Sequence, residues 1–191
     1  MKKILVGTHN TGKFKEIAYL LSKKYKKISP LELKIKSPKE TGNSFKSNAK
    51  LKVKFFSKFV DYAVISDDSG LCIKALNNRP GIFSARLAKK HGSFYKAMKF
   101  ILKKLKNKKN RNAFFKCSLS YKNEKGKITT VQGNLSGKIS MKIKGKKGFG
   151  YDPIFIPKGE VVTFGQMPKL KKIKMDHRFL AFKKLKKKVK I

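Results

Sequence analysis

The sequence predicts a mixed α+β fold, on two observations. In the first half, short apolar runs such as residues 3–8 alternate with segments whose apolar residues recur every three to four positions, which is the period of an amphipathic helix. In the second half, two strand-like runs, 113–122 and 127–140, flank the turn "NEKG", a pattern typical of a hairpin. The long hairpin favours an α+β order over strict βαβ alternation.

Each element follows from its residues. The first helix is expected over 11–25, and Ser44 is expected to cap a second helix over 45–60, where Phe45, Ala49, Val53 and Phe56 recur at helical spacing. Further strands are expected within 29–44, at 62–66, at 71–76 and after the Gly-rich loop 145–153, and further helices at 93–106 and, capped by Asp176, at 177–189. A chain of 191 residues is long enough for one domain with a real core.

The charge is extreme, with 50 basic against 10 acidic residues and a formal net charge of +40. Such an excess is typical of proteins that bind nucleic acid or an anionic membrane surface. However, the lysines are spread along the chain and only four residues are arginine, whereas phosphate and base recognition favours arginine forks. We interpret the lysines as solvated surface positions that give only non-specific polyanion binding, and keep a basic nucleic-acid-binding module as an alternative.

The cysteines and the lengths of the apolar runs indicate in which cellular compartment the protein is expected. Cys72 and Cys117 form no C-x-x-C pair, which suits a reducing environment. No apolar run approaches the ~20 residues of a membrane span. The first residues contain too short an apolar region for a signal peptide. We therefore expect a cytoplasmic protein that does not enter a membrane.

The stretch "GTHNTGKF", residues 7–14, places small polar residues where the first strand enters the first helix. Backbone amides at a helix start, together with Lys13, form a natural anion site. Gly7, Gly12 and Lys13 fit the spacing of a Walker A loop, but Phe14 stands where the magnesium-binding Ser or Thr belongs. A P-loop-like NTPase is therefore an alternative that Phe14 disfavours, and a capped turn with an exposed lysine is another.

Carboxylates are scarce, so their positions are informative. Asp67 and Asp68 follow an apolar strand in "ISDDSG", where successive side chains point to opposite faces, so that one can face a cleft while the other braces the loop. A divalent ion bound with phosphates commonly needs one or two carboxylates. The other reading of the pair is a turn that ends the strand.

Two further loops combine polar and aromatic residues. In "GFGYDP" the glycines let the backbone approach a ligand closely, and Phe149 or Tyr151 is suited to stack on a base. In "DHRF", His177 and Arg178 lie in the first turn of a helix, an anion-friendly position. Either loop taken alone is also consistent with a purely structural turn.

Five segments in this order, "THNTGKFKE", "ETGNSFKSNAKLK", "DDSGLCIKALNNRPGIFSAR", "GFGYDPIF" and "DHR", resemble the inosine triphosphate pyrophosphatase family, the Ham1-like house-cleaning group. The resemblance implies one domain over residues 1–191, with an elongated curved mixed sheet flanked by helices, and two lobes with a central cleft. It implies a homodimer that hydrolyses non-standard purine nucleoside triphosphates (ITP, dITP, XTP) to the monophosphate and pyrophosphate, with Mg²⁺ as cofactor.

Carried over by position, the resemblance implies a role for each matched residue. Asp68 would activate water, and Glu40 and Asp68 would hold Mg²⁺. The substrate would be bound by Thr8, His9, Asn10, Thr11, Gly12, Lys13, Ser69, Phe149, Gly150, Tyr151, Asp152, Lys172, His177 and Arg178. The chain departs from the family at Ser47 and Gln166, where the family often has glutamate, and at Asp176, where it often has serine. These departures put the rate in question more than the reaction class.

Overall fold

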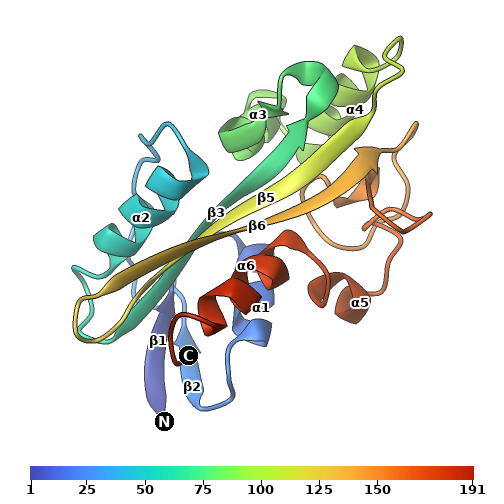
Figure 1. The fold of residues 1–191 in the computed structure, drawn as a ribbon. Coiled ribbons are helices and arrows are strands. Elements are labelled where there is room, and N and C mark those ends of the chain that lie inside the picture. Colours follow the sequence, from blue (N-terminus) through green and yellow to red (C-terminus); the bar gives the residue numbers. More distant parts are fainter. The chain divides into compact units, whose positions relative to one another are not determined.

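The computed structural model describes all residues, 1–191, as an α/β protein with one mixed seven-stranded sheet flanked by helices. Figure 1 colours the chain from its first to its last residue. The strands are β1 (Lys2–Val6), β2 (Tyr25–Ile28), β3 (Ala63–Ile73), β4 (Arg79–Pro80), β5 (Asn112–Lys122), β6 (Ile128–Ile139) and β7 (Phe155–Pro157). The α-helices are α1 (Thr11–Leu20), α2 (Phe45–Phe56), α3 (Ser84–Lys90), α4 (Phe94–Lys104), α5 (Lys169–Ile173) and α6 (His177–Lys186).

The sheet has the order β2-β1-β3-β5-β6-β7, and β4 pairs with β3. β1 is parallel to both β2 and β3, and β7 is antiparallel to β6. The chain divides into two compact units, so that each of β3, β5 and β6 contributes residues to both. Unit 1 comprises Met1–Asp68, Cys117–Gly133 and Arg178–Ile191, and unit 2 comprises Ser69–Lys116 and Asn134–His177.

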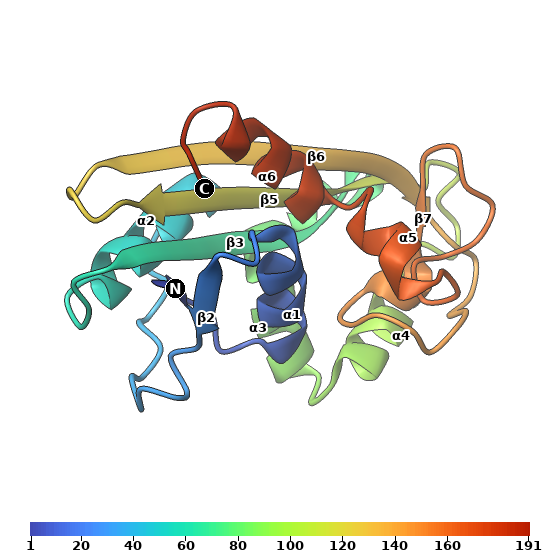
Figure 2. The same cartoon turned by 90° about the horizontal axis from the view of Figure 1, so that it is seen from below.

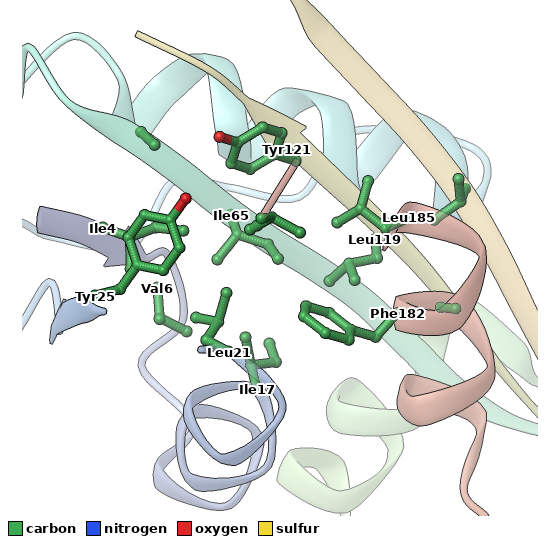
Figure 3. Packing of buried hydrophobic residues seen from close by; sticks show 14 of the residues in the cluster. Ile4, Val6, Ile17, Leu21, Tyr25, Ile65, Leu119, Tyr121, Phe182 and Leu185 are labelled. Carbon is green, nitrogen blue, oxygen red and sulfur yellow. The ribbon is translucent and has the colours of Figure 1, made fainter. Parts of the chain in front are cut away.

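In unit 1 the alternation of side chains along a strand builds two hydrophobic clusters, one on each face of the sheet. Ile4 and Val6 of β1 pack on the side covered by α1 and α6, where Figure 3 shows Phe182 of α6 near Ile17 of α1. Leu5, between them, packs on the opposite side against residues of α2. Figures 1 and 2 show α2 on one side of β3 and α1 with α6 on the other.

Unit 2 has its own core, to which the end of β3, the start of β5, the end of β6 and helices α3 and α4 contribute. Phe155 of β7 and Phe164, both fully buried, pack with Phe115 of β5, whose ring lies 4.6 Å from that of Phe155. Arg111 ties the start of β5 to this core, since its guanidinium donates to the carbonyls of Leu105, Ile139 and Ser140. That structural role accounts for one of the four arginines.

The sequence predictions of the fold are confirmed for class and for most elements, but β4, α3 and α5 were not expected, and three expected segments differ. The first helix ends at Leu20, and Tyr25, the last residue of its expected range, begins β2, which pairs in register with β1. Residues 31–34, expected within a strand, form a turn. The expected break at "DDSG" is absent, and β3 runs unbroken through Asp67 and Asp68 to Ile73. The central cleft and the overall shape implied by the family resemblance stay predictions.

Ser44 caps α2 as expected, and Ser47 supplies the other half of the cap. The Ser44 hydroxyl accepts a hydrogen bond from the amide of Ser47 at 3.1 Å, and the amide of Ser44 donates to the hydroxyl of Ser47 at 3.0 Å. Serine thus fills the position of the Glu or Gln of a capping box. The departure at Ser47 leaves the helix start intact.

Candidate active site

The residues predicted for one site fall into both units. Unit 1 holds residues 8–13, Glu40, Asp67, Asp68 and Arg178. Unit 2 holds Ser69, residues 149–152, Lys172 and His177.

The loop before α1 is organised by its own polar side chains. The Asn10 side chain accepts from the amide of Lys13 at 2.9 Å and so caps α1, while Thr8 accepts from the amide of Asn10. Gly7 is required here, because a Cβ at this position would lie 2.3 Å from the Ser66 hydroxyl oxygen. His9 Nε2 donates to the carbonyl of Ile35, which ties this loop to the segment that leads to Glu40. The result is a capped helix start with Lys13 beside it, as predicted.

Asp67 and Asp68 face opposite sides of β3. Asp67, fully buried, lies 3.2 Å from the ammonium of Lys13 and 3.8 Å from the guanidinium of Arg178. Arg178 also donates to Glu16 of α1 at 2.5 Å. Asp67 is thus the carboxylate that braces the structure, because the helices that carry its cationic partners, α1 and α6, pack on its face of the sheet.

Asp68 points to the α2 side, where its Oδ2 accepts from Asn48 Nδ2 at 2.9 Å. The Asn48 side-chain oxygen in turn accepts from the amide of Gly42, two residues beyond Glu40. Burial raises the pKa of Asp68, and the positive charges of Lys13 and Lys52 offset this only partly. A carboxylate held in place by a neutral amide, with a raised pKa, is suited to accept a proton from water.

Glu40 is paired with Lys52, whose ammonium donates to Glu40 Oε1 at 2.8 Å. Burial by itself would raise the pKa of Glu40, but attraction to Lys52 outweighs it and the pKa lies below its usual value. Burial would likewise lower the pKa of Lys52, but the surrounding charges of Asp67, Glu40 and Asp68 raise it. Lys52 is therefore a buried ammonium at all physiological pH values.

Sequence reasoning missed three contributors in unit 1: Asn48, Lys52 and Glu16. A signal for Lys52 was present in the sequence. It lies seven residues after Phe45 and beside Val53, and hence on the apolar stripe of α2, where a lysine is out of place unless it has an anionic partner. The structure confirms that Lys52 is buried, at 5% exposure.

Glu40 and Asp68 can supply two of the oxygen ligands that Mg²⁺ needs. Oxygen ligands are what Mg²⁺ prefers, and Glu40 and Asp68 both contribute to the electrostatic environment of Lys52. No group of three or more His, Cys, Asp or Glu side chains is arranged to hold a metal. Two carboxylates fit an ion that takes its other ligands from phosphate oxygens and water, as Mg²⁺ usually does at nucleotide sites.

Unit 2 contributes a loop built around Asp152. Asp152 Oδ2 accepts from the amide of Phe149 at 2.7 Å and from the ammonium of Lys172 at 2.5 Å. Gly148, at φ +74°, allows this, because a Cβ there would lie 2.1 Å from the same oxygen. The ammonium of Lys172 also lies 4.5 Å from the ring centroid of Phe149. The aromatic ring, the lysine and the acid thus lie together in unit 2, and their part in substrate binding stays a prediction.

The aromatic residues of this loop differ in exposure. Tyr151 is 2% exposed, its ring packs edge-on against Phe94 and its hydroxyl donates to the carbonyl of Ser84. Its side chain therefore belongs to the core of unit 2, and only the partly exposed Phe149 is suited to stack on a base.

His177 stacks on Phe115, with ring centroids 4.7 Å apart. Gln166 accepts from the amide of Thr163, which gives this departure from the family a local structural role.

The capped start of α1, the lysines Lys13 and Lys52 and the carboxylates around them are features of a protein that binds phosphate groups. A family model described as the Ham1 family matches residues 4–188. The chain belongs to the Ham1 family.

Curated and solved relatives agree with this placement. The chain is 39% identical to a dITP/XTP pyrophosphatase of Caulobacter vibrioides, with 96% of each chain covered. It is 38% identical to that of Bacillus subtilis, over 98% of this chain and 96% of the other. The Ham1 protein of Staphylococcus aureus aligns with a TM-score of 0.85 at 34% identity over 97% of each chain, and a Coxiella burnetii HAM1 protein with 0.86 at 32% over 98%. None of the helices is long and apolar enough to span a membrane.

Proposed function

We propose that this protein is a nucleoside triphosphate pyrophosphatase that hydrolyses dITP, XTP and ITP to the monophosphate and pyrophosphate. The observation that carries the proposal is the arrangement of Asp68, held by Asn48 and set apart from the ion-paired Asp67. The curated relatives named dITP/XTP pyrophosphatase support the substrate class.

The residues of unit 1 carry out the proposed reaction at the phosphates. A water oxygen attacks the α-phosphorus, the bond from that phosphorus to the bridging oxygen breaks, and pyrophosphate leaves. Asp68 accepts the proton of the attacking water. Lys13 and the amides at the start of α1 stabilise the negative charge that develops on the departing pyrophosphate. Glu40 and Asp68 would hold Mg²⁺, which supplies charge neutralisation for the phosphates when bound.

We assign base recognition to the loop of unit 2. The ring of Phe149 offers a stacking surface, and the buried Lys172, which donates one N–H to Asp152, would present another N–H to a 6-keto oxygen. A donor arranged for a keto group is left unpaired by the amino group of adenine, at a cost of about 1–3 kcal/mol per unpaired group. Discrimination against ATP follows from this mismatch.

The test is product analysis across a nucleotide panel. Purified protein with Mg²⁺ should release pyrophosphate from ITP, dITP and XTP at least about tenfold faster than from ATP, the factor expected for one mismatched hydrogen bond. Release of orthophosphate instead would contradict the proposal and favour a P-loop-like NTPase. Omission of divalent ions should abolish turnover.

The rival of another class is a basic nucleic-acid-binding module. Its support is the surface charge, since only three acidic residues, Glu32, Asp61 and Glu124, are exposed. Binding of nucleic acid would not explain why Glu40 and Asp68 lie together with Lys52 in unit 1. It predicts tight, steeply salt-dependent binding of nucleic acid without turnover.

Two further parts of the proposal concern the protein as a whole. We propose that it forms a homodimer and acts in the cytoplasm, as the family resemblance implies. Sedimentation equilibrium measures the first, and fractionation of cells measures the second. A monomer at all concentrations, or recovery with the membrane fraction, would contradict the corresponding part.

A further inference from the structure

The buried ammonium of Lys52 has no part in the reaction as described above. Lys52 projects from the buried face of α2 and is 5% exposed. Its ammonium lies 2.8 Å from Glu40 Oε1, and Asp67 and Asp68 also act on its charge. Ordering and desolvating a lysine is costly, so a buried one needs a specific anionic partner. In this structure that partner is a carboxylate expected to hold the metal.

The charges in this part of unit 1 are nearly balanced. The carboxylates are Glu16, Glu40, Asp67 and Asp68, and the cations are Lys13, Lys52 and Arg178. The cations divide among the carboxylates, with Arg178 at Glu16 and Asp67, Lys13 at Asp67, and Lys52 at Glu40. Asp68 is held by the neutral Asn48, and the positive charges of Lys13 and Lys52 also act on it. Little negative charge is left to attract a free divalent ion.

The geometry points to Lys52 as a positioning residue that holds Glu40 in an ion pair until substrate arrives, so that a divalent cation binds only together with the triphosphate. This inference rests on the proposed function. Two features support it: no three metal-ligating side chains are grouped in advance, and Glu40 is occupied by Lys52. The triphosphate would bring both oxygen ligands for the ion and a new anionic partner for the ammonium of Lys52, which releases Glu40.

The inference predicts the effect of removing the ammonium. Lys52→Met keeps the length and the apolar stem of the side chain but leaves Glu40 and Asp68 without this compensating charge. The free variant should then bind Mn²⁺ at least about tenfold more tightly than the wild type, because two carboxylates that have lost a nearby positive charge favour a cation. Lys52→Arg, which keeps the charge, should behave like the wild type.

The experiment is titration of the protein with Mn²⁺ in the absence of nucleotide, followed by the electron paramagnetic resonance signal of free Mn²⁺. Lys54→Met is the matched control, since it removes the same charge from the exposed face of the same helix. Wild type and Lys54→Met should leave the signal nearly unchanged, and Lys52→Met should reduce it with one ion bound per chain. Mn²⁺ should also raise the melting temperature of Lys52→Met more than that of the control.

Two results would overturn the inference. One is tight, stoichiometric Mn²⁺ binding by the wild type without nucleotide, a measurement that does not depend on the folding of any variant. The other is Mn²⁺ binding by Lys52→Met no tighter than by Lys54→Met; if Lys52→Met does not fold, Lys52→Gln, which keeps a donor for Glu40, takes its place. Failure of the proposed function would appear differently, as no pyrophosphate release from ITP by the wild type while the Mn²⁺ titrations come out as expected.

Discussion

Asp67 and Asp68 are neighbours on one unbroken strand, yet their carboxylates lie on opposite faces of the sheet and have different partners. Asp67 is 3.2 Å from Lys13, on the side of α1, whereas Asp68 accepts from Asn48, on the side of α2. The alternation of a strand therefore separates the ion-paired Asp67 from Asp68, the carboxylate that we propose to be reactive. The two substitutions to asparagine should therefore differ in effect: Asp68→Asn should cost activity, and Asp67→Asn should cost stability.

Asp68→Asn should abolish most turnover and leave the fold intact. Loss of a general base costs about 10²–10⁴-fold in rate. Because burial raises the pKa of Asp68, the ionised carboxylate is unfavourable in the fold near neutral pH, and the melting temperature should stay the same or rise. Pyrophosphate release and thermal unfolding are the two measurements. Asp61→Asn, at an exposed position, is the control, and full activity of Asp68→Asn would contradict the assigned role.

Asp67→Asn should destabilise the protein. It leaves the buried guanidinium of Arg178 and the ammonium of Lys13 with a neutral neighbour, and breaking a buried pair costs about 3–5 kcal/mol. Urea unfolding measures the loss. A variant as stable as the wild type would show that Asp67 does not brace α1 and α6 against β3.

Stability without divalent ions should depend on pH through Glu40. Its pKa lies below the ordinary 4.5 in the fold, so the ion pair with Lys52 stabilises the protein above that value, and this stabilisation is lost as the pH falls through the lowered pKa. The difference in free energy of unfolding between wild type and Glu40→Gln should therefore be largest near neutral pH and shrink in acid. Chemical unfolding in EDTA at several pH values measures it. A difference that grows in acid would contradict the pairing.

Gly148→Ala should cost more than Gly159→Ala, although both glycines have positive φ. The backbone strain of an alanine in this region, about 1–2 kcal/mol, is common to both. At Gly148 the new Cβ would also lie 2.1 Å from the Asp152 oxygen that accepts from Phe149 and Lys172, whereas at Gly159 nothing lies within 4 Å. Thermal unfolding and the KM for ITP test this. Equal stability and unchanged KM in the two variants would argue against a role for the Asp152 loop in substrate binding.

The sequence by itself was enough for the fold class, most helices and strands, and the family. The spacing of apolar residues predicts α2 and α4. The motifs around Lys13, Asp68 and Phe149 are local, so that they can be recognised without knowing what packs against them. The caps at Asn10 and Ser44 are local as well. Each depends on residues within three or four positions of one another.

Only the tertiary structure decided the conformation of "DDSG" and the partners of the buried charges, because both depend on residues far away in the sequence. The segment "DDSG" resembles a turn, but neighbouring strands of the sheet hold it extended, and the resulting alternation gives Asp67 and Asp68 different roles. The pairing of Lys52 with Glu40 and of Arg178 with Glu16 joins residues 12 and 162 positions apart. The sequence shows the charged residues, but the energy of a buried charge depends on what surrounds it, and folding alone determines those surroundings.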